Sequence, residues 1–288
     1  MIENRHFRYF AVLANTLHMT HAAEQLHIAQ PALTQNIQQL EEELGTLLIR
    51  RTGRKLSLTE AGKVFLPEAE RSLQQFELAK IAAQRAGRGE AGQIAIGFGS
   101  AAGLSVVPQM VRAFREKYPD VQVILREIGS DAQVAALRSG DIDLAIAYAL
   151  PHQEFQYREM TAESLVAVLP EHHPLAQNES VSIKELAQDS FILPAQNIAV
   201  TLQGAVLAEC ADAGFTPKYI QEAQTAQTAL GLVAAGLGVT ILPASVRKLR
   251  RDGVVFSPLR NTRIEVRLLM QWKRDDVSPV VQNLLTCI

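Results

Sequence analysis

The chain has 288 residues, of which 48% are hydrophobic and 20% charged, a composition typical of a globular protein with room for two or three hydrophobic cores. Its formal net charge of −2 excludes an overall positive field for nucleic acid, so any basic binding surface has to be local. The two cysteines, Cys210 and Cys287, exclude a disulfide scaffold and a cysteine-rich metal site, and they fit a reducing compartment.

The sequence shows no targeting signal. The first ten residues, MIENRHFRYF, lack the basic segment and apolar core of a signal peptide. No apolar run reaches the ~18 residues that a membrane-spanning helix requires. We therefore expect a cytoplasmic protein.

Residues 19–45, MTHAAEQLHIAQPALTQNIQQLEEELG, have the pattern of two short helices joined by a tight turn. Thr20 is predicted to cap the first helix. The buried side of that helix is predicted to be Ala22, Ala23 and Leu26. Pro31 suits the first turn of the second helix, because its missing N–H and fixed φ cost little there. The apolar face of the second helix consists of Leu33, Ile37, Leu40 and Leu44.

The opposite face of the second helix is polar but carries no charge. It consists of Pro31, Thr34, Gln35 and Gln38. A solvated face usually carries Lys and Glu, whereas Gln pairs bidentately with adenine and Thr offers base edges a hydroxyl and a methyl group. We therefore predict that this face contacts DNA, together with the neighbouring Thr20 and Gln30. The alternative is an ordinary pair of amphipathic helices.

A short basic segment follows the second helix. It contains Arg50, Arg51, Arg54 and Lys55 around Gly53, and its flanks alternate apolar and polar residues as in a β-hairpin. Alone, four basic residues in a loop are usually just solvated. A basic hairpin after a helix-turn-helix, however, is typical of a winged module whose hairpin contacts phosphates or the minor groove. We therefore predict that residues 1–58 bind DNA.

The stretch AAEQLHIAQPALTQNIQQLEEELGTLLIRRTGRKLSLTEAG resembles the DNA-binding domain of LysR-type transcriptional regulators. It shares their paired alanines, the Q-P-A-L-[ST] step, the L-E-x-x-L-G segment, the arginine-rich hairpin and the L-T-x-A-G ending. Two departures matter. His18-Met19 stands where the family usually has Ser-Phe, and Gln35 stands where it often has Arg. Because of Gln35, the DNA sequence of the operator half-site that relatives bind cannot be assigned to this chain.

Residues 59–86 are predicted to form one long helix, with Thr59 as N-cap and Glu60 in its first turn. Pro67 is expected to kink or break it locally. Its apolar residues form a narrow seam: Leu66, Ala69, Leu73, Phe76 and Ala83. A narrow seam on a long helix usually needs a partner helix, so this segment is a candidate for dimerisation. The following GRGEAG segment, residues 87–92, is a plausible hinge.

From Gln93 onward the chain alternates between strand-like and helical segments. The strands are predicted at 93–98, 121–128, 142–149, 164–170, 190–194, 218–223, 238–244, 254–259 and 263–272, and helices at 106–118 and 131–140. Ser182 to Glu185 form a capping box that opens a further short helix. This alternation predicts parallel α/β sheets with sites at the carboxyl ends of strands. The number of strands fits two small lobes better than one sheet.

The first of these strands ends in Gly97-Phe98-Gly99-Ser100-Ala101-Ala102, a G-x-G-x-x-A pattern. One interpretation is a dinucleotide-binding turn of an NAD-dependent oxidoreductase, with Glu127 as its acidic partner. The resemblance implies another. The effector domain of LysR-type regulators is similar to periplasmic binding proteins, with two α/β lobes around a cleft that the helix after the first strand faces. Ser100 would then bind an anion without a nucleotide.

The resemblance implies an α+β multidomain protein, with a winged helix-turn-helix (1–58), a dimerisation helix and hinge (59–91) and a two-lobed effector domain (92–288). The lobes are expected at 92–161 with 265–288, and at 162–264. The implied partners are an operator in double-stranded DNA, RNA polymerase, a small-molecule inducer and further copies of the chain in a homotetramer. No catalytic residue, metal or cofactor is expected. A stand-alone solute-binding protein would leave residues 1–58 unexplained.

Several polar groups are predicted at strand ends followed by helix starts, so the cleft is expected to contain Ser100, Ala101, Ser130, Thr201 and Gln227. Hydroxyls and helix amides without nearby Lys or Arg favour a small, weakly charged anion over a phosphate. The segments PEHHPLA and ALGLVAAGLGVTILPAS are also similar to LysR effector domains, and ALGLVAAGLGVTILPAS is most similar to the branch that controls breakdown of aromatic acids. The expected inducer is therefore a small aromatic carboxylate.

Overall fold

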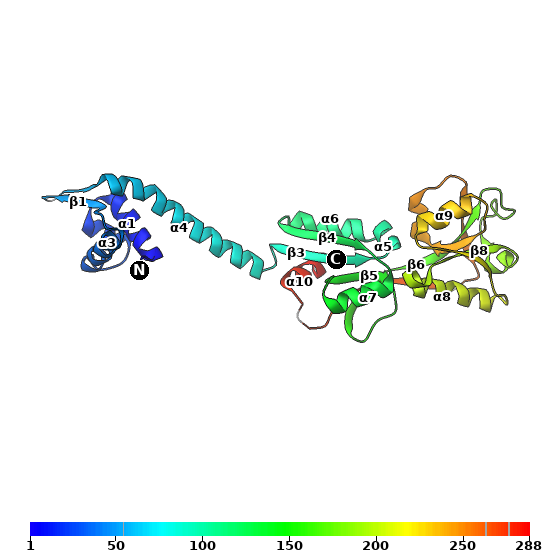
Figure 1. Ribbon diagram of the computed structural model, residues 1–288. Helices are drawn as coiled ribbons and strands as arrows, with labels where there is room; N and C mark the ends of the chain where they lie inside the picture. Colours follow the sequence, from blue (N-terminus) through cyan, green and yellow to red (C-terminus); the bar gives the residue numbers. More distant parts are fainter. Residues whose placement is uncertain (54, 263, 276) are drawn as a thin grey trace. The chain divides into compact units, whose positions relative to one another are not determined.

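The computed structural model describes residues 1–53, 55–262, 264–275 and 277–288. The chain divides into two compact units, Met1–Arg85 and Ala86–Ile288, which we call the N-terminal and C-terminal units (Figure 1). Arg54 of the predicted basic hairpin and the first residue of the predicted strand 263–272 lie outside the described residues. Among the described helices, none is both long and apolar enough to cross a membrane.

The N-terminal unit contains α1 (Asn4–Thr16), α2 (Met19–Gln25), α3 (Gln30–Leu44), β1 (Ile49–Thr52), β2 (Lys55–Leu58) and most of α4 (Glu60–Gly87). Its core confirms the faces predicted for the two short helices. Ala22 and Ala23 of α2 are buried, and α3 contributes the buried side chains of Leu33, Ile37 and Leu40. Pro31 lies in the first turn of α3, as predicted.

The predicted cap of α2 is wrong. The helix begins at Met19, and its N-cap is His18, whose Nδ1 accepts a hydrogen bond from the backbone N–H of His21 at 3.3 Å. An imidazole nitrogen thus takes the place that the pattern gave to a hydroxyl. Thr20 lies inside the helix instead, and its exposed hydroxyl donates to Gln30 Oε1 at 3.1 Å.

The long helix α4 begins where the sequence predicts. The hydroxyl of Thr59 accepts a hydrogen bond from Gly62 N at 3.0 Å and donates to the carbonyl of Leu47 at 2.6 Å. Every residue of α4 is described, and the helix continues through Pro67 without the expected break. Of the predicted seam, Ala69 is buried against the N-terminal core and Phe76 is 49% exposed. The early part of the seam therefore packs within its own unit.

The C-terminal unit is built on strands that the sequence places well. They are β3 (Gly92–Phe98), β4 (Val121–Glu127), β5 (Leu144–Tyr148), β6 (Phe155–Pro170), β7 (Val181–Ser182), β8 (Ser190–Pro194), β9 (Lys218–Ala223), β10 (Thr240–Pro243), β11 (Val254–Arg260) and β12 (Glu265–Lys273). The helices are α5 (Ser100–Leu104), α6 (Val107–Lys117), α7 (Ser130–Ser139), α8 (Gln196–Asp212), α9 (Ala226–Ala234) and α10 (Pro279–Leu285), with 3-10 turns η1 (Ile183–Leu186) and η2 (Ala244–Leu249).

The main sheet is mixed rather than parallel, whereas the separate β8-β9 sheet is parallel as predicted. The main sheet has the order β4-β3-β5-β12-β6-β11-β7, with β10 also paired to β6, and β8 pairs with β9 separately. β3 is parallel to β4 and β5, but β12 is antiparallel to both β5 and β6. β6 has 16 residues and is more than twice as long as predicted. Residues 155–164 of β6 pair with β12, and residues 165–170 pair with β10 and β11. One strand therefore belongs to both of the predicted lobes.

The apolar run in β3 is explained by burial on both faces. Ile94 and Ile96 belong to the core that includes Phe114 of α6, whereas Ala95 packs with Leu137 of α7. Figure 1 shows α6 and α7 on opposite sides of these strands. A strand that is covered on both faces needs apolar residues at every position, so alternation is lost. The predicted capping box at Ser182 and Glu185 is confirmed at the start of η1.

The predicted hinge at 87–92 is held in place by the C-terminal helix. Gly89 is buried with φ +68°, and a Cβ there would lie 2.5 Å from the backbone of Pro279. The side-chain amide of Asn283 on α10 donates to the carbonyls of Arg88 at 2.8 Å and Gly89 at 3.1 Å. The segment that enters the C-terminal unit is therefore packed rather than free.

Candidate functional site

The polar face of α3 lies open to solvent in the N-terminal unit. Gln30, Pro31, Gln35 and Gln38 are all exposed. Thr34 is half-buried, and its hydroxyl donates to the carbonyl of Gln30 at 3.1 Å. Thr34 therefore offers its methyl group and oxygen lone pairs, while the glutamine amides provide both donors and acceptors. This combination can form the paired hydrogen bonds that distinguish base edges in a major groove.

The basic segment forms the predicted hairpin. β1 and β2 pair antiparallel, with Arg50 opposite Ser57 and Thr52 opposite Lys55. Arg50 and Lys55 consequently lie on one face of the hairpin and Arg51 on the other. All three side chains are exposed, and Gly53 takes a positive φ of +62° at the turn. The hairpin thus presents positive charge on both faces near its tip.

Glu41 connects these two elements, and sequence reasoning missed it. Its Oε1 accepts hydrogen bonds from the backbone N–H groups of Leu48 at 2.7 Å and Ile49 at 2.9 Å. A carboxylate on α3 therefore fixes the start of the hairpin relative to that helix. The available sequence signal was the place of Glu41 in the L-E-x-x-L-G segment, directly after Leu40 of the predicted apolar face.

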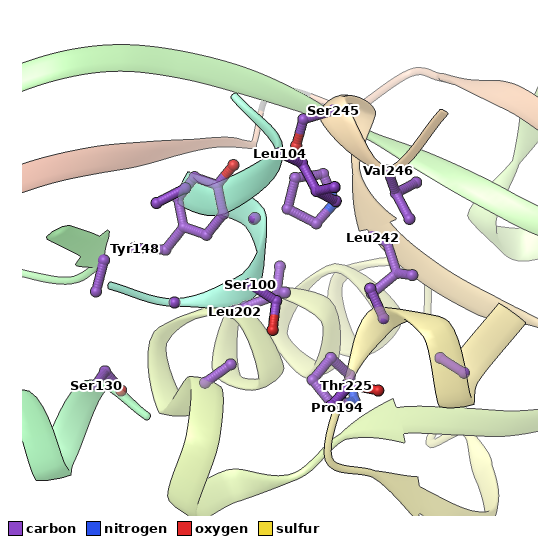
Figure 2. Close-up of a pocket in the computed structure, with 18 of the residues that line it drawn as sticks. Ser100, Leu104, Ser130, Tyr148, Pro194, Leu202, Thr225, Leu242, Ser245 and Val246 are labelled. Carbon is purple, nitrogen blue, oxygen red and sulfur yellow. The ribbon is translucent and has the colours of Figure 1, made fainter. Parts of the chain in front are cut away.

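The C-terminal unit contains a pocket between the ends of β5, β8, β9 and β10 and the starts of α5, α7 and α9 (Figure 2). The space between these elements amounts to about 770 Å³, its open mouth included. Most of the lining is apolar, and its polar members are Ser100, Ser130, Tyr148, Gln224, Thr225 and Ser245. Among the described lining residues there is no Lys, Arg, His, Asp or Glu.

Three of the predicted cleft residues, Ser100, Ala101 and Ser130, line this pocket. Ser100 and Ser130 are the first residues of α5 and α7, as predicted. The hydroxyl of Ser100 donates to the carboxylate of Glu127 at 2.6 Å. Glu127 itself belongs to a neighbouring groove and not to the pocket lining.

The other two predicted residues do not line the pocket. Thr201 lies inside α8, which begins earlier at Gln196, and the pocket is lined there by Ala199 and Leu202. Gln227 is the second residue of α9 and lies in the neighbouring groove. The N-cap of α9 is Thr225, whose hydroxyl accepts from Thr228 N at 3.1 Å and which lines the pocket. The sequence prediction therefore placed the helix starts incorrectly by two to five residues.

One glycine of the pattern, Gly97, has a packing role, whereas a Cβ at Gly99 would meet nothing within 4 Å. Gly97 is buried in β3, and a Cβ there would lie 2.6 Å from the Cδ1 of Ile142. The helix that follows, α5, has only five residues. Close packing against Ile142 therefore explains a glycine at position 97 without a bound nucleotide. In the described part of the chain, no three His, Cys, Asp or Glu side chains come together as a metal site.

Two family models match the chain. The model described as "Bacterial regulatory helix-turn-helix protein, lysR family" covers residues 4–63, and "LysR substrate binding domain" covers residues 87–288. The regulator CatR of Pseudomonas putida is 40% identical over 290 residues, covering 100% of this chain and 98% of CatR. The regulator AlsR of Bacillus subtilis strain 168 is 36% identical over 285 residues, covering 99% of this chain and 94% of AlsR.

A solved structure agrees over the same length. CbnR, a LysR family transcriptional regulator, is 26% identical with a TM-score of 0.86, covering 99% of each chain. The same TM-score of 0.86 is found for full-length CbnR in complex with its target DNA. These matches cover both the helix-turn-helix and the pocket-containing unit, and they support neither an oxidoreductase nor a stand-alone solute-binding protein. The chain is a member of the LysR family of DNA-binding transcriptional regulators, with a C-terminal effector-binding domain.

Proposed function

We propose that this regulator responds to a small, aromatic carboxylate bound in the pocket of the C-terminal unit. The observation that carries the proposal is the lining of that pocket, which combines apolar side chains with Ser130 and Thr225 at the starts of α7 and α9. Its described members include no Lys, Arg, His, Asp or Glu. Helix amides and hydroxyls bind a carboxylate without a counter-charge, and the apolar remainder suits a ring. The similarity of residues 229–245 to regulators of aromatic-acid breakdown supports the same class.

The N-terminal unit is proposed to bind the operator through two surfaces. Gln35 and Gln38 of α3 read base edges, and Thr34 contributes its methyl group. Arg50, Arg51 and Lys55 of the hairpin contact phosphates. The DNA complex of CbnR supports DNA binding by a chain of this fold. We propose further that the chain acts as a dimer of dimers and that its target on the promoter is RNA polymerase.

The carboxylate is tested with a matched pair of ligands. Benzoate and benzamide have the same ring and nearly the same shape, but only benzoate is an anion. The full chain is titrated with each, and unfolding is followed through Trp272, the single tryptophan, which is buried in β12 of the C-terminal unit. Benzoate is expected to raise the unfolding temperature more than benzamide does. An equal or larger shift with benzamide contradicts a carboxylate site.

A further inference from the structure

A separate polar group lies at the pocket, and the proposed function leaves it unused. It consists of Tyr148 at the end of β5, Glu163 in β6 and Ser245 in η2. Tyr148 and Ser245 line the pocket, and Figure 2 shows them on the side away from Ser130 and Thr225. Glu163 is not a lining residue, and its Oε2 accepts a hydrogen bond from the backbone N–H of Ser245 at 2.9 Å.

Three buried atoms of this group, the Tyr148 hydroxyl, Glu163 Oε1 and Ser245 Oγ, have no partner at full hydrogen-bond geometry, although Tyr148 lies close enough to Glu163 and Ser245 to interact with both. Tyr148 is only 7% exposed. Burial first, and then the charge of the Glu163 carboxylate and a hydrogen bond to it, raise the pKa of Tyr148 against a smaller lowering by a hydrogen bond with Ser245, so the phenol keeps its proton. Burying a carboxylate oxygen without a hydrogen-bond donor costs free energy of folding. Most buried polar atoms in native proteins therefore have a partner, which can be a bound ligand.

The three side chains cannot satisfy one another completely. Tyr148 and Ser245 each supply one donor, and with Ser245 donating to Tyr148 and Tyr148 donating to Glu163 Oε1 the Ser245 oxygen still lacks a donor. The carboxylate adds a negative charge that no described cation in the pocket lining offsets. The group therefore has a surplus of acceptors. The pocket is the open space next to this group. Rotation about χ1 of Ser245 turns its Oγ from the group toward the pocket.

We propose that Tyr148, Glu163 and Ser245 form a subsite that binds a hydrogen-bond donor of the inducer, so that the inducer is an aromatic carboxylate bearing a hydroxyl or amino group away from its carboxylate. This inference rests on the proposed function, because it places the donor at one side of the pocket and the carboxylate at the helix starts on the other. The subsite would favour ligands with a hydrogen-bond donor over ligands without one. A ligand without a donor leaves an acceptor of the group buried without a hydrogen bond.

The variant Glu163→Gln tests the subsite without any ligand. Its amide oxygen can keep the bond from Ser245 N, while its NH₂ supplies inside the group the donor that the wild type lacks. The full-length variant is therefore expected to unfold at a higher temperature than the wild type, measured by Trp272 fluorescence. Glu265→Gln, which removes an exposed charge from β12 of the same unit, is the control and is expected to leave the temperature unchanged. An unchanged or lower temperature for Glu163→Gln overturns the proposal.

Ligand selectivity gives an independent test. For the wild type, 3- or 4-hydroxybenzoate is expected to bind at least tenfold more tightly than the methoxybenzoate with the same substitution position, because the methyl ether lacks the donor. The ratio is expected to fall to about one in Glu163→Gln. Equal binding of a hydroxy and methoxy pair to the wild type contradicts the donor subsite.

The two tests separate failure of the subsite from failure of the proposed function. If no benzoate binds the wild type, the carboxylate proposal is wrong, and the unfolding temperature of Glu163→Gln still decides whether the group has a surplus of acceptors. If benzoate binds but hydroxyl and methoxy derivatives bind equally, the carboxylate proposal stands and the donor subsite is wrong. A 4-aminobenzoate arm tests whether nitrogen serves as the donor as well as oxygen does.

Discussion

At the scale of single residues, the contact that links the two candidate DNA-binding elements is made by Glu41. One carboxylate oxygen accepts from two successive backbone N–H groups at the start of the hairpin. Bonds to a charged acceptor are among the stronger hydrogen bonds in proteins, and two buried N–H groups without an acceptor are costly. The position of the basic side chains relative to α3 therefore depends on a residue that itself needs no contact with DNA.

Replacing Glu41 with Ala is expected to destabilise the N-terminal unit by about 1–3 kcal/mol, since both N–H groups lose their acceptor. Urea unfolding followed by far-UV circular dichroism measures the loss. The matched control is Glu42→Ala, which removes the same charge from an exposed neighbouring position on α3. If the two variants have the same stability, the hairpin is held by other contacts.

The DNA-contacting residues are expected to divide into two kinds. Arg51→Ala weakens binding to all DNA sequences and lowers the slope of log K against log[salt] by about one unit, because one phosphate contact is lost. Gln35→Ala keeps that slope and relaxes the preference at one base pair by ~1–3 kcal/mol. Binding to a library of operator variants at several salt concentrations measures both effects. An unchanged base preference after joint replacement of Thr34, Gln35 and Gln38 contradicts the assignment of α3.

At the scale of elements, the connection between α4 and β3 is held by α10, and this predicts a sharp difference between two neighbouring glycines. Gly89→Ala forces a left-handed conformation on alanine, at about 1–2 kcal/mol, and also pushes its Cβ into the backbone of Pro279. Gly87→Ala meets open space and no positive φ. Trp272 fluorescence during unfolding is expected to show a lower stability for Gly89→Ala alone. If Gly89→Ala and Gly87→Ala have the same stability, α10 accommodates the added Cβ at no cost in free energy, and the prediction is wrong.

The elements also show where sequence reasoning succeeds and where it fails. Local patterns were sufficient for α3, the basic hairpin, the start of α4 and most strand positions, because periodicity, caps and turn residues act within a few residues. The length of β6 was missed because its first half, with Tyr157 and Arg158, is too exposed to show an apolar pattern. Its pairing with β12 comes from a segment about a hundred residues away.

The candidate site was predictable to a similar extent. Ser100 and Ser130 follow recognisable strands and lie in the pocket, whereas Thr201 and Gln227 do not line it, because the starts of α8 and α9 were misplaced. Glu163 gave no local signal. It has the pattern of an ordinary polar position in a strand, and only the packing of β5 and η2 around β6 buries its unpaired oxygen.

At the scale of the whole molecule, we expect more than one copy of the chain to act together on the operator. The later part of α4 carries exposed apolar side chains, each 49% exposed: Phe76 on the predicted seam, and Leu78 and Ile81 on the side of the helix away from it. Large apolar side chains repeated along a solvent-exposed helix are typical of an interface with a partner helix. We therefore expect α4 to hold the dimer.

The double replacement Leu73→Glu with Phe76→Glu is expected to give monomers that no longer bind the operator, because burial of each side chain contributes ~1.5–3 kcal/mol to the interface. The matched control is Gln74→Glu with Gln75→Glu, which adds the same charge at exposed positions of the same helix. Sedimentation velocity measures the state of assembly. A tetramer in the Leu73 and Phe76 variant places the interface elsewhere.

The central claim is that occupancy of the pocket in the C-terminal unit changes how the N-terminal units contact DNA. It is tested by a footprint of the full chain on the DNA upstream of its own gene, with and without saturating benzoate or hydroxybenzoate. The expected result is a protected region that changes in length or position with ligand, and a weaker response in Ser130→Ala whose footprint without ligand equals that of the wild type. A wild-type footprint that no aromatic carboxylate alters, or an undiminished response in Ser130→Ala, contradicts the account.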